Sequence, residues 1–222
     1  MVDFSVIFAR ACERNGSEAA LLEGLPEVRS EAALRAVPDD RYLSMMSLRI
    51  FRAGLKHSLV DAKWPAFEEA FSKFSPPRVR AMSEEAVEAL MKDQRLIRHF
   101  GKLRAVHANA AAFCTIAAES GSFANYLAGW PGTRIVELWE DLSKRFQQMG
   151  GNSGPMFLRM AGKDTFIFSE SVAQALVHWQ VADRPPTGKG DRKKMQAAFN
   201  DWTAATGRPL SHLSKILAQS VD

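Results

Sequence analysis

The feature that most constrains the fold of this chain is a pair of adjacent glycines between two segments of helical periodicity. Apolar residues upstream recur at helical spacing, namely Ile135, Leu138, Trp139, Leu142 and Phe146. The segment Gln147–Asn152 interrupts this pattern with Gly150 and Gly151, which adopt backbone conformations that residues with a Cβ atom resist. Ser153 is predicted to cap a following helix, and Gly162 is predicted to end it. The sequence therefore predicts two helices joined by a glycine-containing hairpin.

Two helices joined in this way can hold DNA without reading its sequence. The backbone amides of Gly150, Gly151, Asn152 and Ser153 are expected to converge on one phosphate oxygen at the start of the second helix. An ordinary helical corner is the alternative interpretation, and the glycines alone do not decide against it.

Composition narrows the class of partner only slightly. The formal net charge of +4 suits a polyanion, although proteins that never bind DNA often carry such a charge. No apolar run approaches the roughly 20 residues that span a membrane. We expect no signal peptide, because the first residues contain Asp3 and only a short apolar stretch. Cys12 and Cys114 lack CxxC spacing, which predicts reduced thiols. We expect a cytoplasmic protein without a membrane partner.

A longer pattern resembles a known family. The run GGNSGPMFLRMAGKDTFIFSESV resembles the helix-hairpin-helix and following segment of the DNA glycosylase superfamily that includes endonuclease III. Upstream, Ala53–Leu55 (AGL), Phe71–Met82 and the run IRHFGKLRAVHANA resemble 3-methyladenine DNA glycosylase I, and the match extends from about Pro38 to Trp179. The resemblance implies an all-α fold, a two-lobed helical bundle of about ten helices with one helix-hairpin-helix motif, and removal of damaged bases from DNA.

The resemblance also implies the organisation of the chain and its partners. We expect one glycosylase-like domain over residues 1–222, with one lobe of roughly residues 1–85 plus the C-terminal helices and a second lobe of residues 86–180. The expected partner is double-stranded DNA containing damaged bases, bound by a monomer that needs no cofactor. The zinc site that the family usually carries is not expected, because Cys12 has no plausible set of partner ligands and no His-Cys pair closes the chain.

In the base pocket the sequence departs from the family. Alignment through Ala53–Leu55 places Arg49 where the family's helix, here Asp40–His57, carries a glutamate, and His57 where the family carries a tryptophan. A carboxylate tolerates a cationic base, whereas an arginine repels positively charged 3-methyladenine. Arg49 alternatively binds phosphate or forms an ion pair at the helix surface. His57 either stacks on a base or caps a helix.

The resemblance places two polar residues near the sugar of the extruded nucleotide. Matching TFIFSESV to the superfamily puts Ser169 where many members carry an aspartate, with Glu170 directly after it. A carboxylate there stabilises the oxocarbenium-like sugar or directs water to it. 3-Methyladenine DNA glycosylase I itself lacks this aspartate, so Ser169 is compatible with activity. Glu170 is equally well explained as a charge in the first turn of a helix.

Two basic clusters are candidate phosphate contacts. The first gathers at the start of a helix predicted over Ile97–Glu119 and consists of Arg98, His99, Lys102 and Arg104, for which a solvated face is the alternative. The second lies in the linker-like segment Asp183–Lys194. Asn109 shares the apolar side of the predicted helix with Phe113, which makes it a candidate buried polar residue.

The resemblance implies a monofunctional DNA glycosylase that hydrolyses the N-glycosidic bond of an alkylated purine such as 3-methyladenine. No Schiff-base lysine is indicated. The replacements at Arg49 and His57 motivate an alternative, a DNA-binding protein that keeps the fold but has lost or altered base excision. A helical module without a nucleic-acid role is a third possibility.

Overall fold

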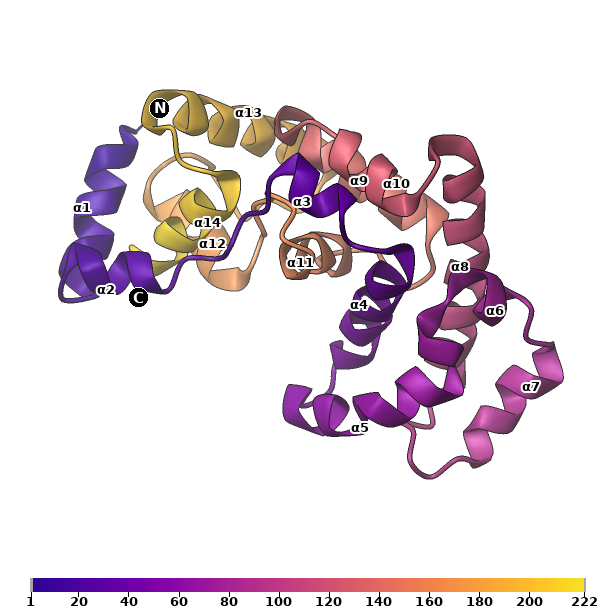
Figure 1. Cartoon of the computed structure of the whole chain (residues 1–222). Coiled ribbons are helices and arrows are strands. Elements are labelled where there is room, and N and C mark those ends of the chain that lie inside the picture. The colour runs from indigo at the N-terminus through magenta and orange to yellow at the C-terminus, as the bar shows by residue number, and fades with distance from the viewer. Residues whose placement is uncertain (1, 222) are drawn as a thin grey trace. The chain divides into compact units, whose positions relative to one another are not determined.

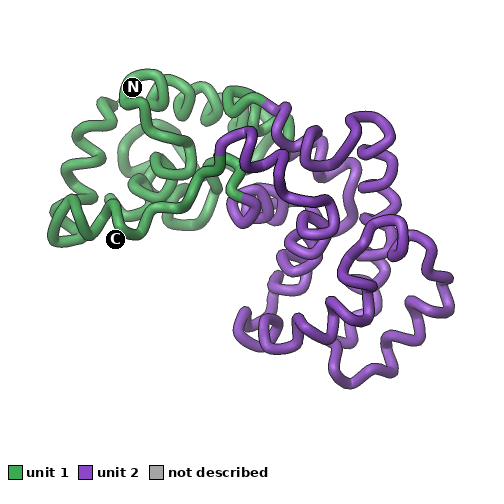
Figure 2. Tube along the Cα trace, in the orientation of Figure 1, with its two compact units in different colours: residues 1–29, 131–138, 162–222 green, residues 30–130, 139–161 purple. Residues whose placement is uncertain are grey.

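The computed structural model describes residues 2–221, which form two compact units (Figure 2). Unit 1 comprises residues 1–29, 131–138 and 162–222, and unit 2 comprises residues 30–130 and 139–161. No strand occurs among the described residues, so the predicted all-α fold class is confirmed. Unit 2 combines residues 30–85 with residues 86–130, whereas the sequence-based prediction divided the two lobes at residue 85. That the chain forms a single glycosylase-like domain stays a prediction.

Unit 2 is built around helices α4 and α8. Its elements are α3 (Glu31–Arg35), α4 (Asp39–Arg52), α5 (His57–Ala70), η1 (Ser72–Phe74), α6 (Pro76–Arg80), α7 (Glu84–Ala89), η2 (Leu90–Lys92), α8 (Phe100–Ser120), α9 (Phe123–Gly129) and α11 (Ser153–Met160). Helix α8 packs against α4, α6, α7 and α9, and α4 also contacts α5 and α11 (Figure 1). Helix α10 (Ile135–Arg145) contributes residues 139–145 to this unit.

Two aromatic clusters fill the interior of unit 2. The first joins α4, α5 and η1 and contains Phe51, Trp64, Phe67, Phe71 and Phe74. The second lies beneath the hairpin and contains Phe113, Phe123, Phe146 and Phe157. The side chains of buried aromatic residues remove large apolar areas from water, so these clusters hold the helices that carry the hairpin.

Unit 1 packs around α14. Its elements are α1 (Phe4–Arg14), α2 (Glu18–Glu23), η3 (Gly132–Arg134), residues 135–138 of α10, α12 (Glu170–His178), α13 (Lys189–Thr206) and α14 (Leu210–Gln219). Helix α14 contacts α1, α12 and α13. Phe199 of α13 stacks on Phe166 with a ring-centroid distance of 4.3 Å and meets Trp202 edge-on. No described helix combines the length and the apolar character that crossing a bilayer requires.

The helix boundaries beside His57 and beside the hairpin differ from the sequence-based prediction. The helix expected over Asp40–His57 ends at Arg52, because Gly54 takes a left-handed φ of +75° that turns the chain. His57 therefore begins α5 instead of ending α4. At the hairpin, Asn152 and not Ser153 is the residue before α11, and Ser153 is the first helical residue.

A carboxylate distant in sequence caps a helix in unit 2. Asp39 accepts hydrogen bonds from the backbone N–H groups of Phe123 and Ala124 at 2.9 and 3.1 Å, which satisfies the first turn of α9. We expect Asp39→Ala to lower the free energy of unfolding by about 1–2 kcal/mol, because both amides lose their acceptor. Urea-induced unfolding measures this change. Asp40→Ala is the matched control, because Asp40 makes only a surface ion pair with Arg41, and a loss as large in this control would contradict the capping role.

Candidate nucleic-acid interface

The hairpin between α10 and α11 reverses the chain through two left-handed residues. Gln148 has φ +63° and Gly151 has φ +58°, a conformation that glycine adopts without steric cost. Ser153 donates its N–H to the Gly150 carbonyl at 3.1 Å, so this amide is engaged inside the turn. The N–H groups of Gly150 and Gly151 find no acceptor within residues 2–221, and both residues are exposed. Two amides are thus available to an anion at this turn.

A buried asparagine braces the hairpin from α8. Asn109 is 1% exposed, and its side-chain amide donates to the Gln147 carbonyl at 3.1 Å while its Oδ1 accepts the Gln147 N–H at 2.7 Å. The sequence-based prediction that Asn109 is buried is confirmed. Its partner was not predicted, because Gln147 lies far along the chain. The paired bonds fix the point where the chain leaves α10 and enters the turn.

Arg49 and Lys102 form a partly buried pair of positive groups in unit 2. The Nε atom of Arg49 is buried and has no hydrogen-bond partner. Burial lowers the pKa of Arg49, and the charge of Arg52 lowers this pKa further. Burial and then the charge of Arg49 lower the pKa of Lys102. Arg52 is paired with Asp61, whereas no ion pair of Arg49 occurs among the described residues, so the surface ion pair considered for Arg49 is absent there.

The Lys102 side chain is buried and bonded to the backbone of unit 2. The residue is 8% exposed, and its ammonium donates to the carbonyls of Ala53 at 2.6 Å and Phe51 at 3.4 Å. It therefore caps the C-terminal end of α4, where carbonyl groups lack helical partners. This burial removes Lys102 from the set of phosphate contacts. Arg98, by contrast, is exposed and remains a candidate.

Leu55, His57 and Leu59 have exposed side chains at the turn from α4 to α5. Of these three residues, the sequence assigned a role only to His57. His57 is exposed at the first position of α5. Leu55 and Leu59 on either side of it are 37% and 50% exposed, so two large apolar side chains flank His57 at the surface of this turn. The AGL triplet marked Leu55 as part of a specific motif, but the sequence-based prediction placed it inside the helix expected over Asp40–His57.

The two residues predicted near the sugar belong to unit 1, whereas Arg49, His57, Arg98, Lys102 and the hairpin belong to unit 2. Ser169 is the N-cap of α12, and its hydroxyl accepts the Val172 N–H at 3.2 Å. Glu170 is exposed in the first turn of this helix. Both have a structural explanation at this helix start, so a chemical role for either stays a prediction.

Unit 2 also contains a cavity of about 300 Å³. Its lining comes from α7, α8 and the hairpin and comprises Glu84, Val87, Glu88, Phe100, Arg104, His107, Ala108 and Gln147. Neither Arg49 nor His57 is among these residues, so the predicted base-pocket residues do not share this cavity. No group of three or more His, Cys, Asp or Glu side chains is placed to hold a metal ion anywhere in residues 2–221.

Comparison with known proteins identifies the family. A model of the methyladenine glycosylase family matches residues 33–153, which is more than half of the 222 residues. The chain belongs to the methyladenine glycosylase family. The matched range contains α4, α8 and the whole hairpin, so the expected family resemblance is confirmed.

Two members of the methyladenine glycosylase family show how much of this chain aligns with known proteins. DNA-3-methyladenine glycosylase 1 of Escherichia coli is 32% identical over 104 residues, which are 47% of this chain and 51% of that protein. A crystal structure of 3-methyladenine DNA glycosylase I is 25% identical with a TM-score of 0.51 and covers 65% of this chain and 86% of that one. The chain spans about half the length of the curated relatives it matches.

A more distant likeness extends over nearly all of the chain. The 8-oxoguanine glycosylase/lyase of Methanocaldococcus jannaschii, solved in complex with DNA containing 8-oxoguanine, covers 96% of this chain and 95% of its own with a TM-score of 0.54. At 13% identity this likeness concerns the fold alone. The helices outside residues 33–153 therefore also follow the fold of a helical DNA glycosylase.

Proposed function

We propose that this chain is a DNA glycosylase of base excision repair that hydrolyses the N-glycosidic bond of alkylated purines such as 3-methyladenine. The observation that carries the proposal is the match of residues 33–153 to the methyladenine glycosylase family. The enzyme would act as a cytoplasmic monomer on double-stranded DNA that contains a damaged base. The two unpaired thiols, Cys12 and Cys114, are in keeping with a reducing compartment.

The proposed DNA contact centres on the hairpin. The exposed amides of Gly150 and Gly151 would bind one phosphate oxygen, with the Asn152–Ser153 start of α11 directing its positive end toward the same charge. Arg98 would add a second phosphate contact. Leu55 is exposed beside a turn and has the apolar side chain that DNA-bending proteins insert between base steps, so we assign it the space left by the extruded base.

The proposed chemistry is direct hydrolysis. The bond between the sugar C1′ and the base nitrogen breaks as the base leaves with the bonding electrons, and water then forms a bond to C1′ and loses a proton. Glu170 would stabilise the positive charge that develops on the sugar or accept the proton of the water, with Ser169 beside it. Arg49 and His57 would face the base.

The experiment for this proposal is chromatography of the free base released from methylated genomic DNA. We expect wild type to release 3-methyladenine and Glu170→Gln to lower the rate at least about tenfold, because the carboxylate charge is lost. An unchanged rate in Glu170→Gln would show that Glu170 has no role in the chemistry and acts only as a charge in the first turn of α12. Glu18→Gln, which neutralises an exposed carboxylate in the first turn of α2, is the matched control.

One observation favours a second candidate function. Arg49 carries a partly buried positive charge without an ion-pair partner in the described residues, and such a group repels a cationic base. The alternative is a DNA-binding protein of the glycosylase fold with lost or altered base excision. Wild type that binds duplex DNA but releases no base in the same experiment would establish this alternative.

A further inference from the structure

Five cationic side chains lie between α12 and α13 and in the first turns of α13 in unit 1. They are Arg184, Lys189, Arg192, Lys193 and Lys194, which we call the α13 basic surface. Arg192 is half-buried and the other four are exposed. None of the five forms an ion pair within the part of the chain that the structure describes, whereas Arg134 of the same unit is paired with Glu137. Their charge is therefore available to an external anion.

The acid within this run is engaged with the local backbone. Oδ2 of Asp191 accepts the N–H groups of Thr187 and Gly188, each at 3.2 Å. These backbone hydrogen bonds hold the pKa of Asp191 below its ordinary value, and the charges of Arg184 and Lys194 lower this pKa further. The carboxylate thus fixes the start of α13 as a capping group. The cations consequently extend from an ordered helix start.

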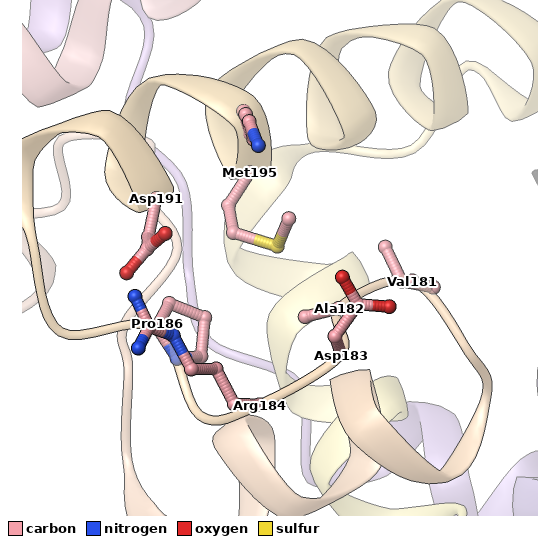
Figure 3. Close-up of a pocket in the computed structure, with 8 residues that line it drawn as sticks. Val181, Ala182, Asp183, Arg184, Pro186, Asp191 and Met195 are labelled. Carbon is pink, nitrogen blue, oxygen red and sulfur yellow. The ribbon is translucent and has the colours of Figure 1, made fainter.

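A cavity of about 410 Å³ opens beside this helix start (Figure 3). Apolar groups of Val181, Ala182, Pro186 and Met195 form part of its lining, and Asp183, Arg184, Asp191 and Lys194 supply its charged groups. Figure 3 shows the Arg184 side chain extending toward Asp191, while the Met195 side chain extends from α13 toward Ala182 and Asp183. The volume lies within the range of about 300–1,000 Å³ that is usual for ligand sites.

We infer that the α13 basic surface binds the phosphate backbone of duplex DNA, as a second contact besides the hairpin. A row of cations satisfies phosphates without reading bases. Residues 183–195 contain no Trp, Tyr or Phe, so the surface lacks the stacking groups with which proteins hold single strands. Duplex is therefore the favoured form. The surface lies outside the family match at residues 33–153, and the inference rests on the proposed function because it takes DNA as the substrate.

The test is the salt dependence of binding to a short undamaged duplex, measured by fluorescence anisotropy between about 50 and 200 mM salt. The variant Lys189→Gln/Lys193→Gln/Lys194→Gln removes three exposed cations from α13. Because each lost phosphate contact lowers the slope of log K against log salt by about 0.9, we expect the slope to fall by roughly 2–3 in magnitude. The control Lys73→Gln/Arg78→Gln/Lys92→Gln removes three exposed cations from unit 2 and is expected to keep the wild-type slope.

The outcomes separate this inference from the proposed function. A slope that is the same in wild type and the α13 variant, or one that falls equally in the control, overturns the inference while base release is unaffected. Wild type that binds no duplex and releases no base overturns the proposed function itself. Circular dichroism of the α13 variant is expected to match wild type, because the three side chains are exposed.

Discussion

Phe113→Ala is expected to lower the free energy of unfolding by about 3–5 kcal/mol, because it leaves a cavity at the centre of the cluster beneath the hairpin. Phe113 is 0% exposed and stacks on Phe123 with a ring-centroid distance of 4.2 Å. It also meets Phe146 edge-on at 5.4 Å, directly before the hairpin begins. Loss of the ring removes apolar burial and aromatic contacts together. Urea-induced unfolding followed by circular dichroism measures the change.

The control for this prediction lies on the same helix. Phe100 of α8 is 41% exposed, so Phe100→Ala removes the same side chain without opening a buried cavity. We expect this control to change the free energy of unfolding by less than about 1 kcal/mol. Equal losses in the two variants would show that the cluster around Phe113 does not support unit 2 as described.

Asn109→Ala is expected to lower the free energy of unfolding by about 2–3 kcal/mol and to weaken DNA binding. The change leaves the N–H and carbonyl groups of Gln147 without the partners that Asn109 supplies at 2.7 and 3.1 Å. Since these bonds set the entry of the hairpin, we expect the Kd for duplex DNA to rise at least about fivefold, or about 1 kcal/mol. Urea-induced unfolding and fluorescence anisotropy measure the two effects.

Asn125→Ala is the matched control for the hairpin brace. Asn125 is an exposed asparagine of the same unit. Its amide donates to the Ser120 carbonyl at 3.2 Å, and its Oδ1 accepts from Arg35 at 3.1 Å. Because both bonds are exposed to water, their loss should cost less than about 1 kcal/mol and leave DNA affinity unchanged. If Asn109→Ala kept wild-type affinity for DNA, the brace would not position the phosphate contact.

Periodicity located several helices from the sequence but not their partners. The helix predicted over Ile97–Glu119 corresponds closely to α8 (Phe100–Ser120), because apolar residues recur at helical spacing along it. The start of α5 was missed. His57 was predicted to end the preceding helix, whereas it is the first residue of α5, which contains Pro65 in its interior.

The roles of individual polar residues depended on contacts that the sequence does not display. Lys102 looked like a phosphate contact beside Arg98, but its ammonium reaches the carbonyls of Phe51 and Ala53 about fifty positions away. Asp39 caps α9 through contacts with residues 84 and 85 positions away in the chain. Local patterns identify which residues are buried or capping, while the fold decides which group each one meets. The assignments of Arg49 and Glu170 came from the family resemblance and stay predictions.

The proposed glycosylase activity is tested most directly by counting abasic sites in a duplex that has been treated with a methylating agent. These sites are detected as strand breaks after cleavage at abasic positions. We expect wild type to produce abasic sites in the methylated duplex in numbers that rise with reaction time and enzyme concentration. In the untreated duplex we expect no more abasic sites than with buffer alone. Gly151→Val, which places a β-branched residue at φ +58°, is expected to reduce the rate at low DNA concentration because it disturbs the phosphate contact. Abasic sites that form in the methylated duplex no faster with wild type than with buffer would contradict the account.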